Sequence, residues 1–241
     1  MLVGGSVATK SSRLVSSADP LEMRRPAARF VSRGGLKLDA ALDAFGIDVV
    51  GRRCLDAGAS TGGFTDCLLQ RGAMSVLAVD VGKGQLDQRL RSDGRVTVRE
   101  STNLRFLSLD ALGGVPYDLV VADLSFISLE LVARVLVAEM PAPGADIVVL
   151  VKPQFEAGRT EASRGHGVIR DDRIRWQALC KVAAAFESHG AKIEGAIASP
   201  LHGAAGNVEL FLHARAGCEP VDYRGADAPP AGVEAPGCND G

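Results

Sequence analysis

Apolar residues gather in short runs along most of the chain, and polar, glycine-containing stretches separate the runs. The runs predict five strands, near residues 53–57, 75–79, 96–98, 119–122 and 146–151. Helical spacing of apolar residues precedes the first strand at 36–45 and recurs between the strands, most clearly at 129–140. Strands that alternate with helices in this way indicate an α/β fold with a parallel sheet between two layers of helices.

The pattern changes in the last third of the chain. Helical spacing over 172–188 is followed by two strand patterns close together, at 192–198 and 207–213. Two such strands favour an antiparallel pair at one edge of the sheet. Residues 157–169 lack apolar periodicity until their end, which is typical of a long loop that is a functional lid or disordered.

Both ends of the chain differ from its middle. The first 26 residues form short extended pieces around turns at Gly4-Gly5 and Asp19-Pro20, too little to bury a core alone. From Cys218 onward the sequence is mostly glycine, proline, alanine and acid, which predicts a disordered acidic tail. We therefore expect four parts: a small segment at 1–26, a linker at 27–33, the α/β domain at 34–215 and the tail at 216–241.

Composition narrows the class of protein. The chain has 241 residues, of which 46% are hydrophobic, so it can build a large core. Its five cysteines show no C-x-x-C spacing and its four histidines do not accompany them, so we expect neither a metal site nor a disulfide framework. The longest apolar runs, such as 147–151, are too short to span a membrane, and no signal peptide is apparent. These features favour a cytoplasmic protein without a membrane partner, which we expect to be a monomer.

The net charge of −2 hides an asymmetry. Residues 1–37 carry seven lysines and arginines against two acids, whereas 216–241 carry one arginine against five acids. A basic arm can bind a polyanion such as RNA, although a solvated basic segment would look the same.

The most informative stretch is residues 54–66, an apolar strand followed by a glycine turn and the start of a helix. Its spacing, Gly58-x-x-x-Gly62-Gly63, matches neither a dinucleotide fingerprint nor a phosphate loop, and the turn contains no lysine. Such a turn suits a nucleotide-like ligand without phosphates, such as S-adenosylmethionine, although glycines can also simply shape a βα turn. Asp80 ends the next strand, where a carboxylate can accept hydrogen bonds from both hydroxyls of an adenosine ribose.

Four charged residues interrupt the apolar pattern where folding does not require a charge. Asp123 and Lys152 each end a predicted strand, Glu209 lies within an apolar run, and Lys37 opens the first helix. Each has a structural alternative, as a helix cap or a surface residue. Together they suit methylation of a hydroxyl, because the reaction needs a proton acceptor and a neutral lysine can be one.

Six motifs in a fixed order strengthen this interpretation: Ser32–Leu38, Leu55–Thr65, Val79–Gly82, Ala122–Leu129, Leu150–Glu156 and Gly206–Glu209. Over residues 3–214 the chain resembles the TlyA (hemolysin A) family, which is similar to the FtsJ-type ribose methyltransferases. The resemblance implies a class I S-adenosylmethionine-dependent methyltransferase with a Rossmann-like α/β fold, acting on the 2′-hydroxyl of ribosomal RNA or ribosomal subunits in bacteria. It places the family's Lys-Asp-Lys-Glu catalytic tetrad on Lys37, Asp123, Lys152 and Glu209.

The resemblance also implies where S-adenosylmethionine binds. Its contacts are expected from Gly58, Ser60, Gly62, Gly63, Phe64, Asp80, Val81, Asn103 and Asp123. We expect Lys152 to act on the target hydroxyl, Asp123 and Lys37 to tune and place it, and Glu209 to orient Lys152. The family usually begins with a complete S4 RNA-binding domain, but only its final part matches here, so residues 1–26 are expected to be a partial S4-like segment.

Other functions remain open at this point. One alternative is a small-molecule O-methyltransferase, which predicts an apolar substrate pocket and no salt-dependent affinity for RNA. Another is a non-catalytic RNA-binding protein that retains the cofactor pocket. A membrane-active hemolysin would need an amphipathic or spanning segment, and the sequence shows none.

Overall fold

The computed structural model describes residues 2–8, 10, 12–22, 28–157 and 167–217. Most of these residues form an α/β domain around one seven-stranded sheet, whose strand order is β6-β5-β4-β7-β8-β10-β9. The strands are β4 (Arg53–Ala57), β5 (Ser75–Val79), β6 (Val96–Arg99), β7 (Tyr117–Ala122), β8 (Pro141–Val151), β9 (Lys192–Ala198) and β10 (Leu210–Arg215). The first five pair in parallel and β10 pairs antiparallel with both β8 and β9, so the expected fold class and the antiparallel edge pair are confirmed.

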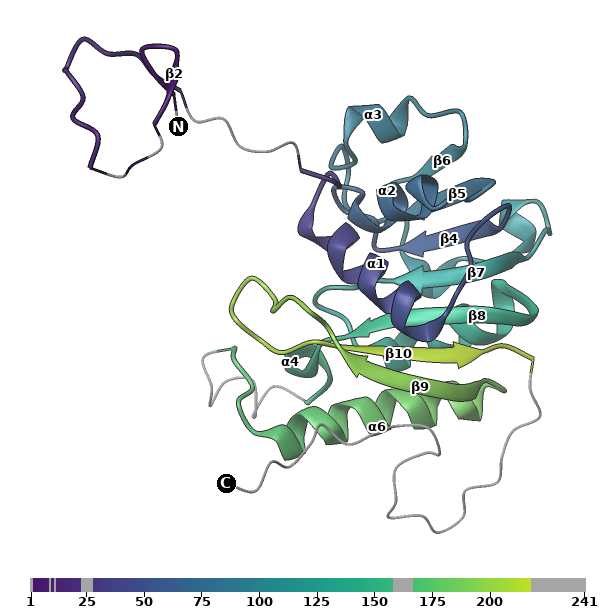
Figure 1. Ribbon diagram of the computed structural model, residues 1–241. Helices are drawn as coiled ribbons and strands as arrows, with labels where there is room; N and C mark the ends of the chain where they lie inside the picture. The colour runs from purple at the N-terminus through teal and green to yellow at the C-terminus, as the bar shows by residue number, and fades with distance from the viewer. Residues whose placement is uncertain (1, 9, 11, 23–27, 158–166, 218–241) are drawn as a thin grey trace.

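Helices cover both faces of this sheet (Figure 1). They are α1 (Arg33–Phe45), α2 (Gly63–Gln70), α3 (Gln88–Arg91), α4 (Pro153–Glu156) and α6 (Asp172–Ser188), with the short helices η1 (Leu104–Phe106), η2 (Asp110–Leu112), η3 (Leu129–Val132) and η4 (Val135–Glu139). One core packs α1, α2 and α3 against the sheet, and the other packs η3, η4 and α6 against the opposite face. Successive residues of a strand point to opposite faces of the sheet, so Leu119 and Val121 pack into the first core and Val120 packs into the second.

Several elements differ in type or extent from their predictions. The helix expected over 129–140 is a 3₁₀ turn followed by a π-helical turn, because apolar periodicity cannot distinguish helix types that bury the same face. Strand β8 begins at Pro141 rather than near 146. Strand β10 begins at Leu210 rather than 207, since Asn207 uses its backbone carbonyl and its side chain in loop contacts instead of the ladder.

The N-terminal segment contains a small antiparallel sheet of order β2-β1-β3, with strands β1 (Leu2–Val3), β2 (Ser6–Val7) and β3 (Leu21–Glu22). The expected turn at Gly4-Gly5 joins β1 to β2, and both glycines have positive φ. Most of the expected loop at 157–169 and nearly all of the expected tail at 216–241 lie outside the described residues. Within the part of the chain that is described, no helix is long and apolar enough to cross a membrane.

Candidate active site

Most of the predicted site residues line two adjoining cavities at the carboxyl ends of β4, β5, β7 and β8, whereas Gly62 and Glu209 line neither. The larger, of about 530 Å³, contains Asp80 and is called the Asp80 cavity; its lining also includes Val79, Val81, Asn103, Leu104 and Val132. The smaller, of about 250 Å³, is called the lysine cavity because Lys37 and Lys152 both line it. The two cavities share Gly58, Ser60, Asp123 and Ser125, so these four residues mark the junction.

The glycine turn is shaped by close packing. Gly58 has φ +87°, and a Cβ there would lie 2.6 Å from the carbonyl oxygen of Asp123. Gly62, the N-cap of α2, has φ +99°, and a Cβ on Gly63 would lie 2.2 Å from Ser32 Oγ. Gly58 lines both cavities, whereas Gly62 lines neither, so part of the motif shapes the turn and part forms the cavity walls.

Asp80 is held as a fixed acceptor in the larger cavity. Its Oδ2 accepts a hydrogen bond from the backbone N–H of Ser60 at 2.8 Å, and its Oδ1 accepts one from Gly82 at 2.7 Å. Ser60 reaches Asp80 with φ +48°, a conformation that is uncommon for residues other than glycine. Val81 and Asn103 line the same cavity as expected, but Gly63 and Phe64 line the lysine cavity instead.

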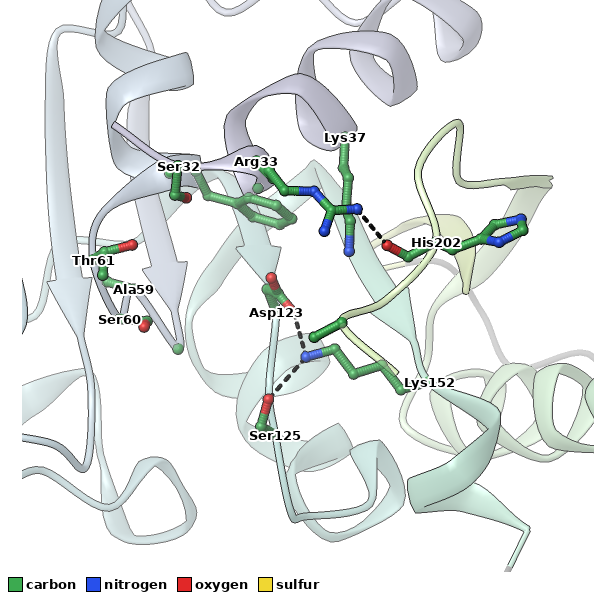
Figure 2. A pocket seen from close by; sticks show the side chains of 15 residues that line it. Ser32, Arg33, Lys37, Ala59, Ser60, Thr61, Asp123, Ser125, Lys152 and His202 are labelled. Carbon is green, nitrogen blue, oxygen red and sulfur yellow. Dashed lines mark hydrogen bonds and ion pairs between the residues drawn. The ribbon is translucent and has the colours of Figure 1, made fainter. Parts of the chain in front are cut away.

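Lys152 lies at the junction, where its Nζ contacts Asp123 and Ser125 (Figure 2) and lies 5.9 Å from the centre of the Phe155 ring. Its Nζ lies 2.6 Å from Asp123 Oδ1 without the alignment of a hydrogen bond, and it donates a hydrogen bond to Ser125 Oγ at 2.9 Å. Pro153 follows Lys152 and opens α4, so Lys152 has the extended backbone that the sequence predicts for a residue before proline. The side chain is about nine-tenths buried and lines the lysine cavity.

Lys37 and Glu209 form the second ion pair, with Nζ and Oε2 2.5 Å apart. This corrects the expectation that Glu209 orients Lys152: the carboxylate serves Lys37 instead. Helix α1 begins at Arg33, so Lys37 lies in its second turn rather than at its start. A Cβ on Gly203 would lie 2.4 Å from Glu209 Oε1, so the loop between β9 and β10 is closely fitted to this pair.

Sequence reasoning missed several residues at the site. Ser125 lies within a quoted motif, two positions after Asp123, and this proximity was the available signal. Arg33 donates a hydrogen bond to the carbonyl oxygen of His202 at 2.8 Å, and both residues line the lysine cavity (Figure 2). Nothing in the sequence around His202 indicates this, because loop contacts leave no periodic pattern. Phe126, at the edge of the Asp80 cavity, is 91% exposed and has φ +65°.

A fourth carboxyl group, that of Asp56, lies beneath the glycine turn. Asp56 is fully buried, and this burial raises its pKa to about 7, although the hydrogen bond from the Thr65 hydroxyl at 2.6 Å acts in the opposite direction. Its Oδ1 has no hydrogen-bond partner among the described residues. The search of these residues for clusters of metal-ligating side chains found none.

Comparisons with known proteins agree with this geometry. The FtsJ-like methyltransferase family model matches residues 30–216. The 16S/23S rRNA (cytidine-2′-O)-methyltransferase TlyA of Mycobacterium tuberculosis is 51% identical over 214 residues, which cover 88% of this chain and 79% of that protein. Hemolysin A of Brachyspira hyodysenteriae is 39% identical over 214 residues, covering 88% of each chain.

Solved structures show the same similarity. A Lactococcus lactis protein described as a hemolysin superposes with a TM-score of 0.75 at 43% identity, covering 79% of this chain and 90% of that one. The N-methyltransferase NodS of Bradyrhizobium japonicum, in complex with S-adenosyl-L-homocysteine, shares the fold at 15% identity with a TM-score of 0.53, covering 77% and 88%. The chain therefore belongs to the FtsJ-like methyltransferase family and, within it, to the TlyA (hemolysin A) group.

Proposed function

We propose that this protein transfers a methyl group from S-adenosylmethionine to a ribose 2′-hydroxyl of ribosomal RNA. The observation that carries the proposal is the position of Lys152, which lies with Asp123 and Ser125 where the two cavities join. A cofactor in one cavity and a hydroxyl in the other would meet at this lysine. The printed names of the relatives from M. tuberculosis and Campylobacter jejuni describe ribosomal RNA (cytidine-2′-O)-methyltransferases, which supports the choice of substrate.

The Asp80 cavity fits S-adenosylmethionine. Asp80 offers carboxylate oxygens to the ribose hydroxyls, and Val79, Leu104 and Val132 supply apolar walls for an adenine. Among the described residues that line this cavity there is no lysine or arginine, which suits a ligand without phosphates. When bound, the cofactor supplies a methyl group on a sulfonium centre. Gly58 and Ser60 would lie beside it, because they also border the lysine cavity.

The lysine cavity would hold the target ribose. In-line transfer forms an oxygen–carbon bond at the 2′-oxygen and breaks the carbon–sulfur bond, whose electron pair stays on sulfur. The hydroxyl proton must leave, and Lys152 in its neutral form is placed to accept it. Lys37, whose charge is balanced by Glu209, would help to hold the hydroxyl oxygen in the same cavity. The role of each of these residues is part of the proposal.

We also propose the domain division from the sequence. The α/β domain at 34–215 agrees with the extent of the family match, and the small sheet of β1–β3 would be the remaining S4-like RNA-binding segment, joined by the linker at 27–33. An exposed aromatic ring at the cavity edge, Phe126, suits stacking on an unpaired RNA base.

The test compares Lys152→Ala and Lys152→Arg with the wild type. Both variants should bind S-adenosylmethionine nearly normally in calorimetry and lose most methyl transfer to ribosomal RNA. Alanine offers no proton acceptor, and the guanidinium of arginine stays protonated. Lys192→Ala, at an exposed lysine on the edge strand β9, is the matched control and should remain active. Near-normal kcat of Lys152→Ala would reject the mechanism. Transfer to small hydroxylated acceptors but not to ribosomal RNA would favour the small-molecule alternative.

A further inference from the structure

Ser125 occupies a position that the proposed chemistry has not yet used. It lines both the Asp80 cavity and the lysine cavity, and its Oγ accepts the hydrogen bond from Lys152 Nζ at 2.9 Å (Figure 2). Among the described residues, the Phe155 ring lies 5.9 Å from this ammonium, and Asp123 supplies a charge beside it but lacks hydrogen-bond alignment. The aligned contact, and therefore the direction in which the amine points, comes from Ser125.

The segment that carries Ser125 is fastened to the segment that carries Lys152. The rings of Phe126 and Phe155 pack with their centroids 5.3 Å apart. Glu156, which is 3% exposed, accepts hydrogen bonds from Ser128 Oγ at 2.5 Å and from the backbone N–H of Leu129 at 2.9 Å. These contacts hold residues 125–129 against residues 152–156, so the Ser125 hydroxyl has a fixed place beside the amine.

A hydroxyl at this place can serve both protonation states of the lysine. It accepts a hydrogen bond from the ammonium, as in the structure, and it can donate one to the free amine after rotation about its C–O bond. The ionised carboxylate of Asp123 can only accept. Ser125 can therefore keep Nζ in place whether Lys152 is protonated or neutral.

We propose that Ser125 is a positioning residue for Lys152, which aims Nζ at the target oxygen at the junction of the two cavities. The inference rests on the proposed function, in which Lys152 acts on the substrate hydroxyl. A residue with this role contributes to kcat through geometry and contributes little to the binding of either substrate.

The first test is kinetic. Ser125→Ala should lower kcat by about 10–100-fold, the range expected when a reacting group is slightly misplaced, while KM for ribosomal RNA and the Kd for S-adenosylmethionine change by less than about threefold. Ser125→Thr keeps a hydroxyl and should restore much of kcat. Ser128→Ala is the matched control, because it removes a hydroxyl from the same segment that bonds Glu156 instead of Lys152. The hydrogen bond from Leu129 N–H to Glu156 and the contact between Phe126 and Phe155 remain in this variant and still hold the segment. Its unfolding temperature should therefore fall, while its kcat should change by less than about threefold.

Two kinetic results would overturn the inference. One is unchanged kcat in Ser125→Ala, and the other is an equal loss of kcat in Ser128→Ala, which would indicate that the segment matters only as a whole.

The second test needs no RNA. Acylation of Lys152 by an amine reagent, followed by mass spectrometry, should be about fivefold faster in Ser125→Ala, the effect of losing one hydrogen bond. Equal acylation would also overturn the inference. A wild-type protein that does not methylate ribosomal RNA, but shows this difference in acylation, would reject the proposed function and leave the role of Ser125 supported.

Discussion

The ion pair between Lys37 and Glu209 allows a quantitative prediction. The side chains are 10% and 4% exposed, and the partners are far apart in sequence, so the pair joins α1 to the start of β10 across the site. At 2.5 Å and an effective dielectric constant near 20, the gross attraction is about 7 kcal/mol, but burial of both charges offsets much of it. Glu209→Gln keeps the shape and removes the charge, which leaves a buried ammonium without a counter-charge. We expect the free energy of unfolding to fall by about 3–5 kcal/mol.

Urea denaturation followed by circular dichroism measures this loss. With an m value of about 2 kcal/mol/M, the midpoint should fall by roughly 1.5–2.5 M. The double variant Lys37→Met/Glu209→Gln removes both charges and should be less destabilised than the sum of the two single variants. Lys192→Gln breaks an exposed pair with Glu194 and should cost less than about 1 kcal/mol. A loss for Glu209→Gln as small as that of Lys192→Gln would refute the reasoning, because it would mean that water already solvates the Lys37 ammonium.

Three further predictions concern other carboxylates. Asp80→Ala should weaken S-adenosylmethionine binding by about 1–3 kcal/mol in calorimetry, and unchanged affinity would reject its role in the cofactor site. Burial alone would raise the pKa of Asp146, but hydrogen bonds from His213 and Arg52 hold it at about 2. Because this pKa is depressed, the stabilisation is present above about pH 4 and is lost as the pH falls towards 2. Asp146→Asn should therefore be less stable than wild type at pH 7, by on the order of 2 kcal/mol, and denaturant titrations should show the gap closing over that range. Burial raises the pKa of Asp56 to about 7, so its neutral form stabilises the fold below about pH 4 and this contribution is lost as the pH rises through 7. The free energy of unfolding of Asp56→Asn minus that of wild type should therefore be larger at pH 8 than at pH 5 in the same assay.

The positions of Asp80, Asp123 and Lys152 could be predicted because each follows an apolar run that had to become a buried strand. Parallel strands bring their carboxyl ends to one edge, so the sequence also indicated that the three side chains share that edge. The same argument identified the glycine turn after β4. These predictions depend only on the strand pattern and the direction of the strands.

The pairing within the site could not be predicted in the same way. Either acid of the tetrad could have served either lysine, and only the packing of the β9–β10 loop around Gly203 brings Glu209 to Lys37. His202 lies in a segment without periodicity, so no pattern marks it, and the only signal for Ser125 was its proximity to Asp123. Asp80 lines the Asp80 cavity, whereas Phe64 lines the lysine cavity. The spacing of a motif does not predict this difference, because it depends on the direction in which each side chain points.

The two ion pairs differ in a way that bears on which lysine exchanges a proton. Both lysine side chains are 10% exposed, but the carboxylate beside Lys152 is 25% exposed and that beside Lys37 is 4% exposed. A proton that Lys152 receives from the substrate must afterwards reach solvent, and the partly exposed surroundings of this pair leave it a way out. The surroundings of Lys37 and Glu209 leave no such way out, and the buried carboxylate instead keeps the Lys37 charge fixed. This asymmetry supports Lys152 as the proton acceptor and Lys37 as a fixed cation in the proposed mechanism.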